Sequence, residues 1–224
     1  MYKKILLMVC VGSLMVLSSC SEQKVPFFND HVIQMWAQTL QPYSVDIAFF
    51  GDSRVALGTW EEAFADSDVV NLGIGGDIIE GTIQRLPLLE ALDVRYCFLA
   101  IGANNCSRDT FSAVEFRNNY TVLLHGLEEL GISIYVNTIA GVTTVNSSIG
   151  AALAARMNAN IIVANEIIRD LADKSAIPLI DMATVMNNAD GSLKTEYSVD
   201  GIHFSDAGNQ VWYDSLRPYI EAIP

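Results

Sequence analysis

An α/β fold with a five-stranded parallel sheet is the architecture that this sequence predicts. Five short apolar runs alternate along the chain with longer stretches of helical periodicity. Such alternation is typical of βαβ units, whose crossover helices cover both faces of the sheet and form a three-layer α/β/α sandwich. The length of 224 residues suits one medium-sized domain, and a composition that is 51% hydrophobic and 17% charged excludes a disordered chain.

Each predicted strand is a short apolar run that ends near glycine or a polar residue. The five runs cover residues 46–50, 68–72, 94–101, 132–138 and 177–181. Glycine-rich residues 73–76 close the second strand. Ligands of such sheets bind beyond the carboxyl ends of the strands, near the point where the strand order reverses. We therefore expect the functional residues just after these runs.

The predicted helices connect these strands and close the chain. They cover residues 54–64, 77–92, 110–130, 146–174 and 206–220. Asp77 is the expected N-cap of the second helix, which Pro87 is expected to disturb because proline lacks a backbone N–H. No internal repeat or linker interrupts the sequence of this domain.

The N-terminus has the pattern of an export signal. Lys3 and Lys4 precede the apolar residues 5–17, as the n-region and h-region of a secretory leader do. Residues 17–20 resemble a bacterial lipobox, in which the leader is cut before a cysteine, here Cys20, and the thiol of that cysteine is lipidated. An ordinary signal peptide with an incidental cysteine is the alternative.

This pattern divides the chain into three expected parts. Residues 1–19 are the lipoprotein signal peptide, residues 20–42 a lipidated arm with an accessory helix, and residues 43–224 the main domain. A lipid on Cys20 implies a place in the bacterial cell envelope, at the outer membrane or the cell surface. That anchor is the expected membrane contact, and the sequence does not indicate an oligomeric state.

Charge and cysteine content exclude several classes of function. The chain has 13 Lys and Arg against 26 Asp and Glu, and its formal net charge of −13 excludes nucleic acid as a partner because it repels phosphates. The four cysteines and three histidines share no spacing typical of a zinc site. Cys97 lies in an apolar run and is expected to be a buried free thiol, with a disulfide to Cys106 as the alternative.

Polar and glycine-rich clusters follow the predicted strands. Ser53 comes after the first strand, Gly76 after the second and Asn104 after the third. Asp200 and His203 lie three residues apart, in a loop before the last helix. Each cluster alone is often only a capped turn or a close helix–strand contact. Their joint occurrence, in this order and at these places, is much more specific.

With these motifs the sequence resembles the SGNH (GDSL-type) hydrolases, a family of serine esterases and lipases with a flavodoxin-like fold. The resemblance extends from residue 46 to about residue 219. It implies that Ser53 is the nucleophile and that Asp200 and His203 are the catalytic acid and base. It also implies that Gly76 and Asn104, with the serine, form the oxyanion hole.

The residue types suit acyl transfer on chemical grounds as well. A serine hydroxyl is a weak nucleophile until a base takes its proton, and His203 is the one histidine in a suitable place. Asp200 can accept a hydrogen bond from the imidazole and hold its tautomer. The N–H groups of Ser53 and Gly76 and the side-chain amide of Asn104 can stabilise an oxyanion. This chemistry requires no metal or organic cofactor.

Several other side chains have both a functional and a structural interpretation. Arg54 stands where the name motif of the family has leucine. A solvated place on the first helical turn is expected for it, and contact with an anionic substrate group at the pocket rim is the alternative. Trp36, Trp60 and Trp212 are expected to pack inside the domain, with a sugar platform as the alternative. His31 and His125 are expected at surface or packing positions.

The expected function is hydrolysis of small acyl esters, acetyl esters above all, on a small molecule or a glycan. A lysophospholipase or arylesterase that prefers longer acyl chains is one alternative. An acyltransferase with the same residues is another, because an acceptor alcohol can replace water. A surface glycan-binding protein without turnover is the third alternative, which the intact Ser53, Asp200 and His203 disfavour.

Overall fold

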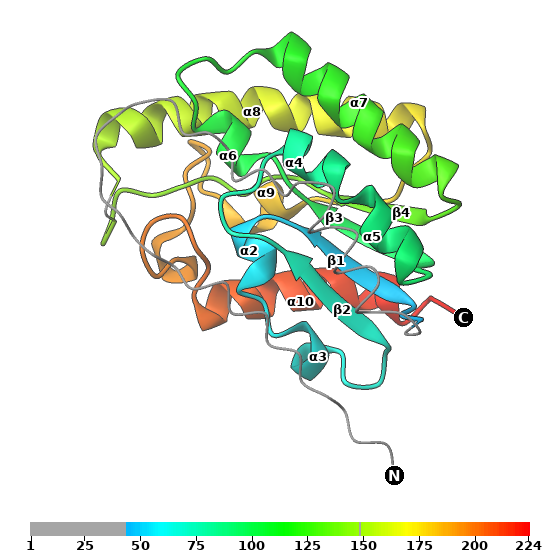
Figure 1. Cartoon of the computed structure of the whole chain (residues 1–224). Helices are drawn as coiled ribbons and strands as arrows, with labels where there is room; N and C mark the ends of the chain where they lie inside the picture. The colour runs from blue at the N-terminus through cyan, green and yellow to red at the C-terminus, as the bar shows by residue number, and fades with distance from the viewer. Residues whose placement is uncertain (1–43, 148) are drawn as a thin grey trace.

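A five-stranded parallel sheet lies at the centre of the protein (Figure 1). The computed structural model describes residues 44–147 and 149–224; the predicted leader, Cys20 and the predicted arm at residues 20–42 lie outside them. The sheet has the order β2-β1-β3-β4-β5 and its pairs are parallel, which confirms the predicted sheet. Its strands are β1 (Ile47–Gly51), β2 (Val69–Gly73), β3 (Tyr96–Ala100), β4 (Ser133–Asn137) and β5 (Leu179–Ile180).

The strand order reverses between β1 and β3. From β1 the chain crosses to β2 on one side and then returns to β3 on the other side of β1. In open parallel sheets the crevice at such a point, beyond the carboxyl ends of the strands, is where ligands bind. β1 is buried along its whole length because it is paired on both edges and covered on both faces.

Helices cover both faces of the sheet, as predicted (Figure 1). One face carries α4 (Ile79–Gln84), α5 (Leu86–Ala91), α7 (Ala113–Glu129) and α8 (Ala151–Lys174). The other face carries α3 (Trp60–Ala63), α9 (Met182–Met186) and α10 (Asp206–Ile220). Two short helices, α2 (Ser53–Ala56) and α6 (Ala103–Cys106), directly follow β1 and β3, and a 3-10 turn, η1 (Thr195–Tyr197), precedes the loop that leads into α10.

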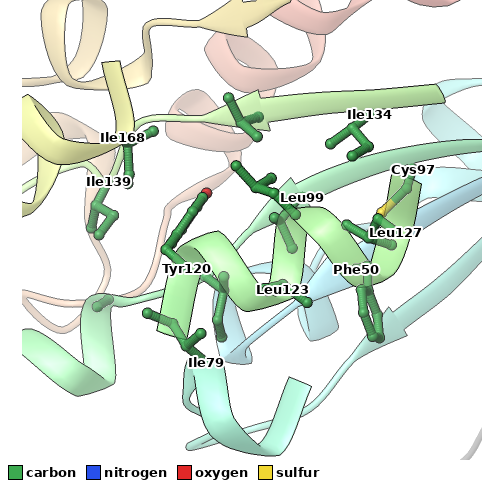
Figure 2. Packing of buried hydrophobic residues seen from close by; sticks show 14 of the residues in the cluster. Phe50, Ile79, Cys97, Leu99, Tyr120, Leu123, Leu127, Ile134, Ile139 and Ile168 are labelled. Atoms are coloured by element: carbon green, nitrogen blue, oxygen red, sulfur yellow. The ribbon is translucent and has the colours of Figure 1, made fainter. Parts of the chain in front are cut away.

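The two faces of the sheet enclose separate hydrophobic cores because neighbouring residues of a strand point to opposite sides. Phe50 and Leu99 face α7, where they pack with Leu123 and Leu127 (Figure 2). Phe49, the neighbour of Phe50, faces the opposite core.

An aromatic cluster fills the core on the α10 side. The rings of Phe49 and Trp60 stack with centroids 3.9 Å apart, and Trp212 meets Trp60 edge to face at 4.8 Å. Trp60 and Trp212 are buried, so these two tryptophans pack inside the domain as predicted and do not form a sugar platform. Trp36 lies outside the described residues.

Two predicted helices are interrupted; the prediction of one continuous helix was wrong for residues 54–64, whereas a disturbance of the second helix near Pro87 was expected. Residues 54–64 form α2 and α3, separated at Gly58, which lies against the Trp60 ring so closely that a Cβ would approach within 2.4 Å. Residues 77–92 form α4 and α5, which meet at Arg85 because the Arg85 N–H bonds Thr82 and Pro87 has no N–H to donate. The short helices α6 and α9 were not predicted, since four or five residues carry no clear periodicity.

The remaining helices agree with the sequence to within a few residues. α10 has the predicted bounds, and Ser205 caps it by accepting a hydrogen bond from the Gly208 N–H. Within residues 44–147 and 149–224, none of the helices combines the length and the apolar character that crossing a membrane requires.

Candidate active site

The turn after β1 places Ser53 at the carboxyl edge of the sheet, where the strand order reverses. Asp52 caps α2 by accepting a hydrogen bond from the Arg54 N–H at 3.0 Å. Ser53 is therefore the first residue of a helix and is half-buried at the end of β1. This is the place that the sequence predicts for the nucleophile.

A continuous hydrogen-bonded chain joins the three residues predicted as nucleophile, base and acid. His203 Nε2 lies 3.0 Å from Ser53 Oγ, and His203 Nδ1 lies 2.7 Å from Asp200 Oδ2. The other carboxylate oxygen, Asp200 Oδ1, accepts hydrogen bonds from the N–H groups of Ile202 and His203. The geometry is that of a serine, an imidazole and a carboxylate placed to orient the imidazole.

The Asp200 carboxyl stays ionised in this arrangement. Partial burial acts to raise its pKa, but hydrogen bonds from the His203 N–H, the His203 ring and the Ile202 N–H outweigh burial and leave the pKa below its ordinary value. An ionised carboxylate is the form that accepts from the imidazole N–H.

The loop that carries Asp200 and His203 is held by its own backbone. Val199 N–H donates to the His203 carbonyl, and the Ser198 hydroxyl donates to the same carbonyl. Gly201 has φ of +93°, and a Cβ there would lie 2.4 Å from the Thr143 carbonyl oxygen, so only glycine fits. The Thr143 N–H also donates to the Gly201 carbonyl at 2.9 Å.

The predicted oxyanion residues lie on the neighbouring turns. Gly76 follows β2 with φ of +77°, and Asn104 lies in α6 directly after β3. One side-chain N–H of Asn104 donates to the Asp77 carbonyl at 2.8 Å, which ties α6 to the glycine turn. In the part of the chain that the structure describes, the backbone N–H groups of Ser53 and Gly76 have no protein acceptor.

A buried ion pair beneath the glycine turn was missed in the sequence. Arg85 Nη2 lies 2.5 Å from Asp77 Oδ2, and both side chains are nearly inaccessible to solvent. The same guanidinium donates to the carbonyls of Leu72 and Gly51 and lies 4.4 Å from the centre of the Phe50 ring. It thus binds together the carboxyl ends of β1 and β2 and the residue after Gly76. The sequence signal that could have indicated this ion pair was Arg85, a single arginine in an apolar stretch.

Arg54 is buried, so the expected solvated position was wrong. The side chain is 6% exposed, and its guanidinium donates to three backbone carbonyls of distant loops. It lies inside the protein, where these carbonyls occupy its donors. A first-turn residue is normally solvated, but here the loops after β4 and before α10 fold over it.

Asp52 is also buried, and it borders a narrow cavity. Burial raises the pKa of the Asp52 carboxyl to about 6, while the Arg54 charge and the Arg54 N–H act in the opposite direction. The cavity has a volume of about 20 Å³, enough for a single water molecule, and is lined by Asp52, Arg54 and the ends of β3 and β4.

The other candidate side chains are placed as follows. Cys97 and Cys106 are buried free thiols, which confirms the prediction for Cys97 and excludes the disulfide alternative. His125 is an exposed residue of α7, 3.5 Å from Glu129, and His31 lies outside the described residues. Among residues 44–147 and 149–224, no group of three or more His, Cys, Asp or Glu side chains is arranged to hold a metal ion.

Comparison with known proteins identifies the class as acylhydrolases with an α/β fold. The chain belongs to the GDSL-like lipase/acylhydrolase family, whose model matches residues 49–211. The matched range contains the serine, glycine and asparagine motifs as well as the loop with Asp200 and His203.

Solved structures of similar proteins share the fold. A protein of Streptococcus pneumoniae named as a platelet activating factor is 27% identical, with a TM-score of 0.71 over 85% of this chain and 92% of that one. An acylhydrolase of Bacteroides fragilis is 17% identical, with a TM-score of 0.72 over 84% of this chain and 95% of that one. A GDSL-like lipase of Bacteroides thetaiotaomicron is 15% identical, with a TM-score of 0.72 over 86% and 98%.

Curated relatives include N-acylneuraminate cytidylyltransferases from strains of Streptococcus agalactiae. They are 24% identical over 153 residues, which is 68% of this chain. The aligned region is 35% of their length, so the chain matches about a third of these longer proteins.

Proposed function

We propose that the protein is a serine esterase that hydrolyses small acyl esters, acetyl esters above all. The observation that carries the proposal is the unbroken hydrogen-bonded chain from Asp200 through His203 to Ser53 at the carboxyl edge of the sheet. Ser53 is the nucleophile, His203 the general base and acid, and Asp200 the group that orients the imidazole.

The first half of the proposed reaction acylates the serine. Ser53 Oγ attacks the carbonyl carbon of the ester while its proton passes to His203 Nε2, and the carbonyl oxygen becomes an oxyanion. When the tetrahedral intermediate collapses, the bond to the alcohol oxygen breaks. His203 Nε2 gives its proton to that oxygen, and the alcohol leaves.

The second half regenerates the enzyme with water. A water molecule gives a proton to His203 Nε2 and attacks the carbonyl carbon of the acyl-serine. Collapse of the second intermediate breaks the bond to Ser53 Oγ, which recovers its proton from His203, and the carboxylic acid is released.

Three donors surround the proposed position of the oxyanion. They are the N–H of Ser53, the N–H of Gly76 and the second side-chain N–H of Asn104, whose first one is bound to Asp77. Donors of this kind each contribute about 10²–10³-fold to the rate, because they are already oriented when charge develops.

A small acyl group on a carbohydrate suits the cell-surface location that the lipobox predicts. The alcohol part of the substrate is proposed to be a carbohydrate, since the curated relatives are named for an N-acyl sugar acid.

Hydrolysis of p-nitrophenyl esters from acetyl to dodecanoyl tests this function. We expect turnover of the acetyl ester, and a loss of at least about 10³-fold in Ser53→Ala and His203→Ala. Ser215→Ala and His125→Ala are matched controls, because the Ser215 hydroxyl only bonds a carbonyl of its own helix and His125 is exposed on α7. Both controls are expected to retain full activity.

Each alternative has its own outcome in this experiment. A preference for long chains favours the lysophospholipase or arylesterase, and equal rates in the native protein and Ser53→Ala refute the nucleophile. Absence of turnover on every ester favours the glycan-binding protein. Added acceptor alcohols separate the acyltransferase, which forms a new ester at the expense of free acid.

We also propose that the protein is tethered to the bacterial cell envelope by a lipid on Cys20. Residues 17–20 support this proposal, since they have the pattern of a lipobox after an apolar leader. Growth with labelled palmitate is expected to label the native protein and to leave Cys20→Ser unlabelled. Label on both proteins, or on neither, contradicts the proposal.

A further inference from the structure

We propose that Arg54 is a positioning residue that holds the loop of Asp200 and His203 against the nucleophile. The inference rests on the proposed function. Arg54 directly follows Ser53 in α2, and its Nε donates to the Ile202 carbonyl at 3.0 Å. Ile202 precedes His203, so one side chain links the backbone beside the serine to the backbone beside the base.

The other end of the guanidinium is attached to the segment after β4. Arg54 Nη1 donates to the Ala140 carbonyl at 2.6 Å, and Nη2 donates to the Gly141 carbonyl at 2.9 Å. A guanidinium carries donors on three nitrogens in one rigid plane, so three carbonyls that accept from it hold fixed relative positions. Arg54 therefore joins three parts of the chain: α2, residues 139–143 and the loop before α10.

The segment after β4 gives the guanidinium a fixed base. Asn165 of α8 bonds both the N–H and the carbonyl of Ile139, and Asn158 of the same helix bonds both groups of Val142. Backbone groups paired on both sides in this way have little freedom to move. The segment therefore provides a rigid support against which Arg54 holds Ile202.

Charge and packing favour this buried position for an arginine. Burial lowers the pKa of the guanidinium, and the carboxylates of Asp52 and Asp200 act in the opposite direction. The guanidinium also lies 4.9 Å from the centre of the Phe204 ring, which is itself one residue beyond His203. The positive charge is thus offset by two carboxylates that belong to the same site.

The catalytic consequence follows from the tolerance of the proton transfer. His203 Nε2 must lie within hydrogen-bond distance of Ser53 Oγ, and a displacement of about 1 Å costs roughly 10²-fold in rate. Leucine at position 54 has no donor for the Ile202 carbonyl. Lysine keeps the positive charge, but one ammonium group cannot reproduce the planar fork.

The test compares Arg54→Leu and Arg54→Lys with Asn187→Ala. Asn187 accepts from the Gly141 N–H and so anchors the same segment, and within the described residues it makes no hydrogen bond to the loop of Asp200 and His203. Two experiments are made on the full-length protein: steady-state kinetics with p-nitrophenyl acetate, which give kcat and KM, and amide hydrogen exchange of residues 199–203.

For Arg54→Leu we expect kcat to fall by about 10²-fold with KM changed less than threefold, and exchange at residues 199–203 to rise at least tenfold. Arg54→Lys is expected to fall between the native protein and Arg54→Leu. Asn187→Ala is expected to keep kcat within about twofold although it loosens residues 139–143. Near-ultraviolet circular dichroism tests whether Arg54→Leu folds. If it does not fold, Arg54→Lys decides alone. Native kcat and native exchange in Arg54→Lys then contradict the proposal, and a tenfold fall in kcat at native KM supports it.

Three results overturn the positioning role. They are a kcat of folded Arg54→Leu within threefold of native, an equal loss of kcat in Asn187→Ala, and unchanged exchange at residues 199–203 in Arg54→Leu. Failure of the proposed function is distinct, because then the native protein itself has no turnover while exchange still responds to loss of the guanidinium. In that case the link between loops stands and its catalytic purpose is refuted.

Discussion

Asp52 makes the stability of this protein depend on pH in a direction opposite to that of most carboxylates. Burial raises its pKa from the ordinary value of 3.8 to about 6. Between these two values the folded protein holds a proton that the unfolded chain has already lost. Stability from this group is therefore present at acid pH and is lost as the pH rises from about 4 to about 6.

The size of the effect follows from the two pKa values. At 1.36 kcal/mol for each pH unit between them, the ionised carboxylate of Asp52 costs the folded state roughly 3 kcal/mol at neutral pH. Asp52→Asn removes the titration and preserves an oxygen that accepts from the Arg54 N–H. We expect the free energy of unfolding of Asp52→Asn, minus that of the native protein, to increase by up to roughly 3 kcal/mol between pH 4 and pH 7.5.

Urea denaturation at pH steps across this range measures the difference. Asp190→Asn is the control: hydrogen bonds from Ser192 lower the pKa of this exposed carboxyl from 3.8, so above about pH 5 it is ionised in both the folded and the unfolded state. Its difference from native is expected to be flat above that pH. A difference for Asp52→Asn that is constant within about 0.5 kcal/mol refutes the burial argument, since 3 kcal/mol is well above the error of the method.

Two further predictions concern the glycine turn. Gly76→Ala is expected to lower kcat at least tenfold, because φ of +77° is strained for alanine and a shifted backbone moves the N–H. Gly75→Ala is the control, since Gly75 has no such φ and equally open space around it, and its kcat is expected to stay within twofold of native. Equal kcat values for the two variants contradict this reasoning. Arg85→Met leaves a buried carboxylate without its partner and is expected to lower the free energy of unfolding by about 3–5 kcal/mol in urea denaturation; a loss below about 1 kcal/mol is the contrary result.

The sheet and the last helix could be predicted from the sequence because their signals are local. Each strand is an apolar run between polar ends, and the predicted runs differ from the observed strands by a few residues. Residues 206–220 follow Ser205, a favourable N-cap, and α10 has those bounds. The break at Gly58 was missed because it depends on the position of the buried Trp60 ring, which lies against Gly58. The break at Arg85 lies two residues before Pro87, the residue that was expected to disturb this helix.

In the candidate site, too, some residues could be predicted from local sequence and others could not. Ser53, Asp200 and His203 could be named in advance because short motifs contain them, and the structure brings their side chains together. The environment of Arg54 could not be predicted, since its acceptors lie 86, 87 and 148 residues away in the chain. From the sequence alone, a charged side chain next to a motif is expected to be solvated, because the distant loops that cover it cannot be recognised.

The two asparagines of α8 have a consequence for chain length. Asn158 and Asn165 are seven residues apart, which corresponds to a rise of about 10.5 Å along the helix. Asn158 binds Val142 and Asn165 binds Ile139, so the bound backbone segment spans three residue steps and covers about 10 Å when extended. The helix between the two asparagines and the backbone segment that they bind thus have nearly equal lengths and run in opposite directions. One residue added to or deleted from either span would misalign them, although aliphatic exchanges at Ile139 and Val142 would leave these backbone contacts in place.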